Sequence, residues 1–207
     1  MSNRVIPTKA NLLNLKDQVA FAQKGYELLD KKRTVLIQEM MRLNGVAKNL
    51  QGEIHKMIEQ SYGSLIDATI VMGSENVEGL SQSMALEPGF DLQSRSVMGV
   101  EVPKINYKKR PLKTEYSFHQ STAAFDQASL DFNQLLYYIY QLAEIETSVF
   151  RIAQEIKQTA KRANALDKIQ IPKFTENIKM IEDVLAEKER EDFFRLKKVK
   201  KKREDKS

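Results

Sequence analysis

Two long heptad repeats constrain this chain more than any other feature of its sequence. The first repeat places an apolar or small residue at alternating steps of three and four between residues 12 and 57, with Arg33 as its polar exception. The second repeat runs in the same way between residues 118 and 163 and is interrupted by Ser121 and Glu146. A repeat that averages about 3.5 residues keeps its apolar stripe facing one partner only if two helices wind around each other with a left-handed twist. The sequence therefore predicts an all-α fold built on a long antiparallel two-helix coiled coil.

The residues expected to form the seam of this coiled coil are mostly large and apolar. They are Leu15, Val19, Tyr26, Leu29, Leu36, Met40, Leu43, Leu135, Ile139, Leu142, Val149 and Ile156. In one antiparallel register the paired residue numbers sum to about 189, so that large residues face small ones, as Leu36 faces Ala153. In a second register the sum is about 175, and small residues face each other, as Ala22 faces Ala153. Both registers are compatible with the sequence.

Glycine and proline separate the two repeats. Most of the 8 glycines and 5 prolines lie between residues 63 and 111, so both long helices must end around this insert. We expect the first helix to reach about Met72, before Gly73. The resulting organisation is an amino-terminal helix over residues 1–72, a tip insert over residues 73–114 and a carboxy-terminal helix over residues 115–207.

The insert carries the pattern of a β-hairpin. Residues 90–97 and 100–107 are short runs that contain β-forming residues, on either side of Met98 and Gly99. Pro103 would then lie on an exposed edge, because proline has no amide hydrogen for the sheet. Residues 74–86 are polar and fit either a loop or a short helix.

Proline also predicts a break in the second long helix. Pro172 has no amide hydrogen, and its ring would clash with the carbonyl of Lys168 in a regular helix. We therefore expect the helix to stop or kink near Asp167, with a break over residues 168–172, and a terminal helix to start at Pro172. The basic surplus of residues 190–207 equals the net charge of +5 of the whole chain, so the remaining body is neutral. That distribution argues against a nucleic-acid groove along the coiled coil.

The common catalytic chemistries lack their residues. The chain has no Cys, no phosphate-binding glycine loop, no nucleophile elbow and no zinc-protease motif. Its 2 histidines, His55 and His119, fit helix-surface positions better than metal ligands. We expect no catalytic residue, no cofactor and no metal. No apolar run reaches the ~20 residues of a membrane span, and the start lacks a signal-peptide core, so a cytoplasmic location is expected.

Several long blocks of the sequence resemble one known family. The opening PTKANLLNLKDQVAFAQKGYELLDKKRTVL resembles the amino-terminal helix of the D subunit of the V-type and archaeal-type rotary ATPases. RANALDKIQIP and EREDFFRLKKVKKK resemble the carboxy-terminal signature of that family, and VMGVEVPKI is similar to its mid-chain segment. Thr34 departs from the pattern, because the family often has an acidic residue after its Lys-Arg pair.

The resemblance implies a central rotor shaft without catalytic activity of its own. The two termini would enter the ring of catalytic A and non-catalytic B subunits, and the bend would face the membrane. The small central-stalk F subunit would pack on the flank, and the tip would sit on the funnel-shaped subunit that joins the membrane rotor ring. A shaft of this kind is a peripheral part of a membrane-bound complex that couples ATP hydrolysis or synthesis to H⁺ or Na⁺ transport.

The candidate contact residues follow from the resemblance and from side-chain chemistry. Those expected at the catalytic ring are Arg162, Asn164, Arg190, Phe193, Phe194, Arg195, Lys197 and Lys198. Arg33 and Glu146 are candidates for the flank partner, or else seam defects whose charged ends reach water.

Two other function classes fit a coiled coil with a basic tail. One is a cytoskeletal or membrane-adaptor protein, and the other is a nucleic-acid binder that uses residues 190–207. Copurification with a nucleotide-hydrolysing ring would favour the rotor, whereas strongly salt-dependent nucleic-acid binding would favour the tail hypothesis.

Overall fold

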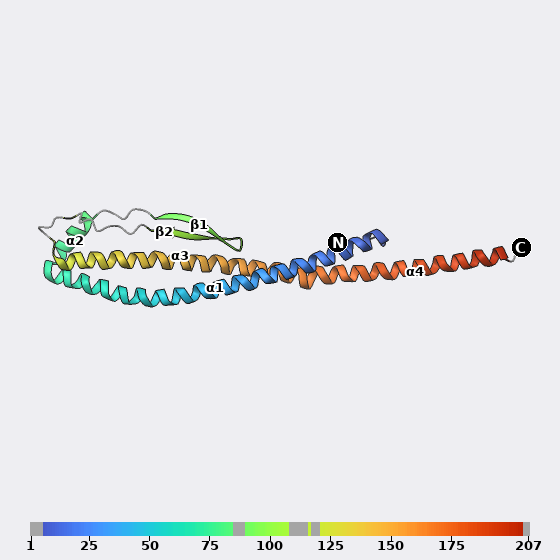
Figure 1. Ribbon diagram of the computed structural model, residues 1–207, viewed down its shortest axis with the longest axis horizontal. Helices are drawn as coiled ribbons and strands as arrows, with labels where there is room; N and C mark the ends of the chain where they lie inside the picture. Colours follow the sequence, from blue (N-terminus) through green and yellow to red (C-terminus); the bar gives the residue numbers. More distant parts are fainter. Residues whose placement is uncertain (1–5, 85–89, 108–115, 117–120, 205–207) are drawn as a thin grey trace. The chain divides into compact units, whose positions relative to one another are not determined.

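The computed structural model describes residues 6–84, 90–107, 116 and 121–204. Its elements are, in chain order, α1 (Lys9–Met72), α2 (Ser74–Ser83), β1 (Asp91–Val97), β2 (Val100–Asn106), α3 (Ala123–Ala165), the π-helical turn η1 (Leu166–Gln170) and α4 (Ile171–Glu204) (Figure 1). The predicted fold class, an all-α coiled coil with a small β-hairpin insert, is confirmed. Residues 74–83, which fitted a loop or a helix, form α2.

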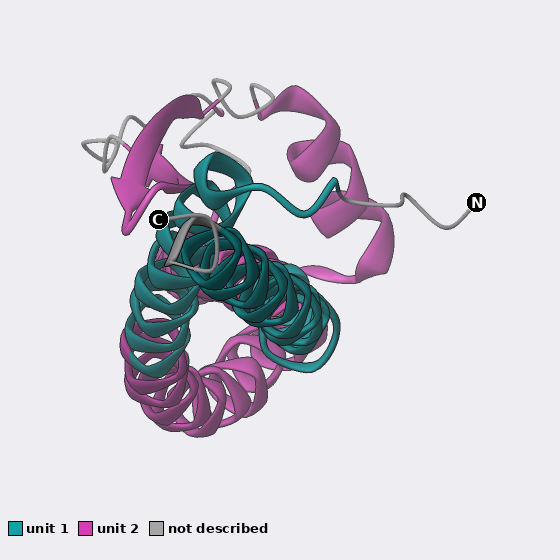
Figure 2. Ribbon diagram, turned by 90° about the vertical axis from the view of Figure 1, so that its right-hand side faces the viewer, with its two compact units in different colours: residues 1–34, 157–207 teal, residues 35–156 magenta. Residues whose placement is uncertain are grey.

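The chain forms two compact units (Figure 2). Unit 1 contains residues 1–34 and 157–207, and unit 2 contains residues 35–156. The long helices α1 and α3 each contribute to both units. This division differs from the three sequence segments inferred from glycine and proline, which stay a prediction.

The seam of α1 follows the first heptad repeat. Leu15, Leu36 and Ala47 are buried. Their neighbours in the repeat are half-buried: Val19, Tyr26, Leu29, Met40 and Leu43. Arg33 is also half-buried, and its guanidinium forms an ion pair with Asp30 at 2.6 Å. The polar position of the repeat is therefore satisfied within its own helix.

The burial of side chains on α3 contradicts part of the seam that the second repeat predicts. Leu135 is buried, and Leu142, Val149 and Ile156 are half-buried, as predicted. Ile139, however, is 42% exposed, and the alternate seam positions fall one residue earlier than predicted. These positions are Tyr138, Ile145 and Ile152, where the prediction had Ile139, Glu146 and Ala153. A step of three and a step of four from Leu135 both reach an apolar residue, so the repeat alone does not select one of them.

The partners of α1 and α3 within unit 2 settle the register. Leu36 and Ile152 lie in one apolar cluster. Leu50 and Ile54 lie in a second cluster with Leu135. Ala68 and Phe125 lie in a third. These pairs run antiparallel and lie close to the register summing to about 189, whereas the register summing to about 175 is wrong.

A tight turn closes the β-hairpin. β1 and β2 pair antiparallel, with Val97 opposite Val100. The two turn residues both have positive φ angles, 51° for Met98 and 79° for Gly99. That geometry is typical of a two-residue turn whose twist matches the flanking strands. The hairpin predicted around these two residues is confirmed.

The hairpin is docked on the coiled coil of unit 2, where it lies alongside α3 (Figure 1). Val100 and Val102 pack in the cluster of Leu36 and Ile152. The amide of Ile105 donates to Glu144 Oε2 at 2.8 Å. Arg151 Nη1 donates to the carbonyl of Glu101 at 3.0 Å. Side chains of α3 therefore satisfy backbone groups on the outer edge of β2. Pro103 was predicted on an exposed edge, but it is half-buried.

The expected break at Pro172 takes the form of a π-helical turn. The chain stays helical from α3 through η1 into α4, so of the two predicted alternatives, a stop or a kink, the stop does not occur. The π-helical residues Leu166–Gln170 directly precede α4, in which Pro172 is the second residue. Widening the helix by one residue lets the chain pass a residue without an amide hydrogen.

A buried carboxylate joins the two helices of unit 2. Asp131 is 4% exposed and accepts hydrogen bonds from Ser64 Oγ at 2.6 Å, Gln60 Nε2 at 3.2 Å and Gln127 Nε2 at 3.0 Å. Three donors compensate for its lost hydration. A polar group at one position of a seam specifies register, because a slipped pairing would leave it buried without these donors.

A buried hydroxyl in unit 1 yields a prediction. Thr159 is 0% exposed, and its Oγ1 has no hydrogen-bond partner among the described residues. Thr159→Val replaces this hydroxyl by a methyl group of similar size, so we expect the free energy of unfolding to rise by about 1 kcal/mol. Urea unfolding followed by circular dichroism measures the change. Thr147→Val, at an exposed position, is the matched control and should change it by less than about 0.5 kcal/mol.

Candidate interaction surfaces

The end of α4 is exposed. At the start of α1, Lys9 forms an ion pair with Glu189 at 2.9 Å, and Lys16 pairs with Glu182 at 2.7 Å. The hydrogen bond to Glu189 raises the pKa of Lys9. Among the described residues, the ion pairs that join α1 to α4 end at Glu189, and residues 190–202 of α4 are exposed.

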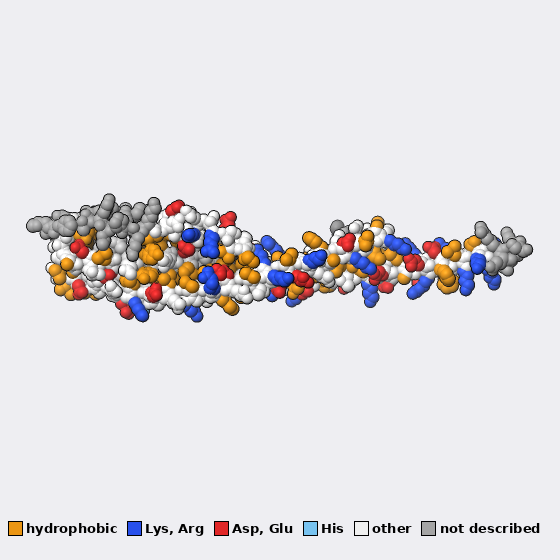
Figure 3. All heavy atoms as spheres, viewed as in Figure 1, with side chains coloured by type: hydrophobic (Ala, Val, Ile, Leu, Met, Phe, Trp, Pro, Cys, Tyr) orange, Lys and Arg blue, Asp and Glu red, His pale blue; other side chains and the backbone are white. Residues whose placement is uncertain are grey.

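The exposed end of α4, residues 190–202, interleaves apolar and cationic side chains, as Figure 3 shows. Phe193 and Phe194 are each 66% exposed, and Leu196 is 69% exposed. Large apolar side chains gathered on a solvated helix mark a surface that binds another protein or a membrane. Four predicted ring-contact residues lie here besides the two phenylalanines: Arg190, Arg195, Lys197 and Lys198.

The arginines of this segment pair with acidic neighbours on the same helix. Arg190 Nη1 lies 3.2 Å from Glu187 Oε2. Arg195 lies 3.5 Å from Glu191 and 3.6 Å from Asp192. Solvent-exposed pairs of this kind contribute little to stability, so both guanidinium groups can exchange these acids for acids of a partner.

The other predicted contact residues do not join this segment. Arg162 and Asn164 are exposed near the carboxyl end of α3, in unit 1. Of the two flank candidates, Arg33 pairs with Asp30 in unit 1, and Glu146 accepts a hydrogen bond from Gln51 at 3.3 Å in unit 2. Glu146 is exposed beside the seam and is not a defect within it. The roles of these four residues stay predictions.

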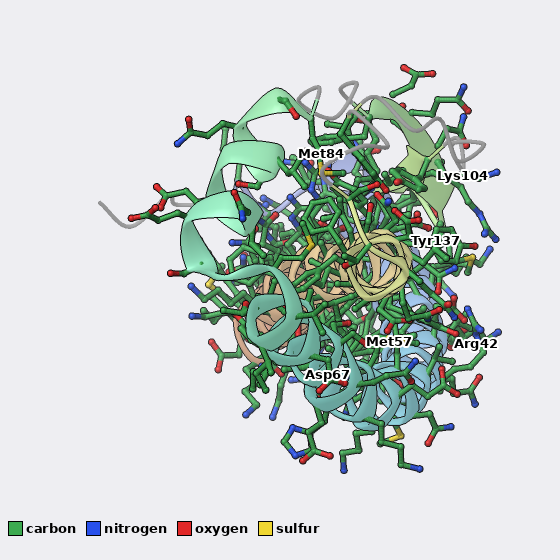
Figure 4. All side chains as sticks on the ribbon, turned by 90° about the vertical axis from the view of Figure 1, so that its left-hand side faces the viewer. Arg42, Met57, Asp67, Met84, Lys104 and Tyr137 are labelled. Atoms are coloured by element: carbon green, nitrogen blue, oxygen red, sulfur yellow. The ribbon has the colours of Figure 1, made fainter. Side chains whose placement is uncertain are left out.

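A second exposed apolar surface lies at the bend of unit 2. Along α1, Tyr62, Ile66 and Ile70 recur at steps of four and are 55%, 59% and 76% exposed. In the same unit, Leu80 of α2 packs with Ala68 and Phe125, and Met84, which is labelled in Figure 4, contacts the same cluster. No sequence pattern singled out this surface, because its residues alternate with seam residues of the same chemistry.

Tyr116 anchors the chain to the start of α3 and yields a pH prediction. Its hydroxyl donates to Asp126 Oδ1 at 2.5 Å, and its ring contacts Phe125. Burial first, and then the hydrogen bond to Asp126, raise the pKa of Tyr116 to about 12.

A tyrosine with a raised folded-state pKa stabilises the fold below its unfolded pKa of about 10, and this contribution is lost as the pH rises toward 12. Tyr116→Phe should remove the last step of tyrosinate absorbance and flatten the fall in stability between about pH 10 and 12. Tyr62→Phe, at an exposed position, should leave that last step in place.

The described residues do not assemble a metal site or a membrane span. No group of three or more His, Asp or Glu side chains among them is placed to hold a metal ion. His55 lies 3.6 Å from Glu59 on the surface of α1, and His119 lies outside the described residues. No described helix combines the length and the hydropathy that a bilayer crossing requires.

These features define a class of protein: a coiled-coil protein with a docked β-hairpin and with exposed apolar surfaces at a helix end and at the bend. The family model for the ATP synthase D subunit matches residues 11–201. A V-type ATP synthase D subunit from Thermotoga neapolitana is 42% identical over 198 residues, which cover 96% of this chain and 98% of the relative. The A-type ATP synthase D subunit of Pyrococcus furiosus is 36% identical over 200 residues, which cover 95% and 94%. The chain belongs to the family of ATP synthase D subunits.

Proposed function

We propose that the chain is the central-stalk rotor subunit of a V-type or archaeal-type rotary ATPase. In this role it transmits torque between the nucleotide-hydrolysing ring and the ion-translocating rotor in the membrane, and it catalyses no reaction itself. Family membership over nearly the whole chain supports this role. The observation that carries it is the exposed end of α4, where Phe193 and Phe194 lie among arginines and lysines.

The chemistry of this segment suits a rotating contact. The apolar side chains supply contact area, and the cations supply attraction to an acidic lining of the ring. Each exposed charge pair contributes little, so the total attraction is spread over many weak contacts. A surface that bound the ring strongly at one angle would oppose rotation, whereas many weak contacts permit stepping.

The remaining partners are proposed from what the family resemblance implies. We place the funnel-shaped subunit at the bend surface of Tyr62, Ile66 and Ile70, because that apolar surface is exposed in unit 2. The small central-stalk F subunit is assigned to the flank of the coiled coil, with Arg33 and Glu146 as candidate contacts.

Reconstitution tests the proposal. The chain, coexpressed with the catalytic A and B subunits, should copurify with the assembled ring, and deletion of residues 190–207 should abolish this association. Copurification that is unchanged after the deletion would place the ring contact elsewhere and contradict the proposed orientation.

A further inference from the structure

A hollow in unit 2 lies beside the carboxyl end of β2, and none of its described lining residues belongs to the end of α4 or to the bend surface. Its volume is about 610 Å³, and α1, α3 and the end of the hairpin line it. This volume falls within the range of ligand pockets, which is about 300 to 1,000 Å³. The described lining residues that matter here are Val46, Asn106, Tyr107, Tyr137, Tyr140 and Glu144.

Aromatic rings form one wall of this pocket. The ring centroid of Tyr107 lies 5.8 Å from that of Tyr137 and 5.2 Å from that of Tyr140. Phe90 extends the wall, with its ring centroid 5.4 Å from that of Tyr140. Figure 4 shows Tyr137 on the side of α3 toward the hairpin strand that carries Lys104. Mutual ring contacts hold the wall in place before any ligand arrives, and the faces of aromatic rings attract cations.

Glu144 gives the pocket a negative charge. Its Oε2 accepts the amide hydrogen of Ile105 at 2.8 Å, which fixes the half-buried carboxylate at the wall. A carboxylate has two oxygens and about four acceptor sites, so this one bond leaves capacity for a charged donor. The described lining contains no Lys or Arg to balance the charge. The guanidinium of Arg151 is used further along the hairpin, at the carbonyl of Glu101.

We propose that this pocket binds an arginine or lysine side chain presented by a partner protein. The tyrosine rings would stack on the cation, and Glu144 would form the ion pair, with Asn106 offering a further acceptor. Exposed apolar groups at the pocket favour a protein over a free small cation as the source. Val46 is 42% exposed and Phe90 is 45% exposed, and only a larger partner would cover both.

The pocket chemistry is tested on the full-length chain with isotope-labelled tyrosine rings. N-acetyl-arginine amide should shift the NMR signals of Tyr137 and Tyr140 saturably, whereas the neutral isostere N-acetyl-citrulline amide should not. Glu144→Gln keeps an acceptor for Ile105 but removes the charge, so the affinity for the arginine derivative should fall at least about tenfold. Glu53→Gln, at an exposed position of α1 outside the pocket, is the matched control and should leave the affinity unchanged.

Several results would overturn the proposal. Equal shifts with arginine and citrulline derivatives would show that no cation is recognised, and an unchanged affinity in Glu144→Gln would remove its proposed role. Binding that arises only after Lys108, Lys109 and Arg110 are changed to Ala would show that the chain itself supplies the cation.

The source of the cation is tested in the native complex. Nitration of tyrosines by tetranitromethane, read by mass spectrometry, should modify Tyr137 and Tyr140 in the isolated chain and much less in the complex. Glu144→Gln should weaken this protection. Equal nitration in both states would exclude a partner side chain from the pocket, and it would leave the proposed rotor role unaffected, because that role rests on the end of α4.

Discussion

Leu36→Asp is expected to lower the free energy of unfolding by about 4 kcal/mol or more. Leu36 is 0% exposed and lies in one cluster with Ile152, Val100 and Val102. Truncating a buried leucine alone costs about 2 to 5 kcal/mol, and the substitution adds a carboxylate without a partner. Since domains are stable by only about 5 to 15 kcal/mol, the variant should lose much of its helicity at physiological temperature. Circular dichroism during urea unfolding measures both quantities.

Ile139→Asp is the matched control for that variant. Ile139 belongs to the predicted seam but is 42% exposed, so an aspartate there keeps its water. We expect a loss of about 1 kcal/mol or less. Equal, large losses in both variants would show that Ile139 is buried in solution and would restore the original phase of the second repeat.

The second large effect is expected on ring binding by the exposed end of α4. Phe193→Ala and Phe194→Ala together should weaken binding of the isolated ring at least about thirtyfold, because a single aromatic anchor at an interface is typically worth about 2 kcal/mol or more. Both side chains are exposed, so the helicity and the unfolding midpoint should stay close to those of the wild type. Phe150→Ala is the control, since Phe150 is 62% exposed but lies on α3 in unit 2.

Charge reversal separates the electrostatic part of that contact. Arg190→Glu with Arg195→Glu should weaken ring binding in a salt-dependent way, with the largest deficit at low ionic strength. Binding of the flank partner should be retained. A deficit that is confined to the flank partner would mean that the end of α4 lies outside the ring.

The seams show how far a heptad pattern determines packing. The first repeat located the buried face of α1, although some of its steps also offered two apolar residues, such as Val46 and Ala47 after Leu43. On α3, Ile139 and Tyr138 were both acceptable after Leu135, and the sequence did not reveal that the hairpin packs beside Ile152. The packing of the hairpin against Ile152 is a tertiary contact that the heptad repeat does not encode.

Polar features were harder to predict than apolar ones. Asp131 sits directly before Phe132, and the heptad pattern leaves it among the surface residues, although Ser61 and Ser64 on α1 mark a polar stretch of seam. The irregularity before Pro172 was located correctly, but the sequence left open whether the helix would stop or kink, and a helix can also widen where a proline removes a hydrogen bond. The aromatic pocket was not predicted, because it combines side chains from three segments that are far apart in the sequence.

Rotation is the most direct test of the proposed role. The chain contains 0 Cys, so Ser94→Cys on the exposed strand β1 provides a single attachment point for a bead. With the ring fixed to a surface, we expect ATP to drive stepwise rotation of the bead in one direction. A bead that stays still on complexes whose ATP hydrolysis continues at the normal rate would contradict the rotor assignment.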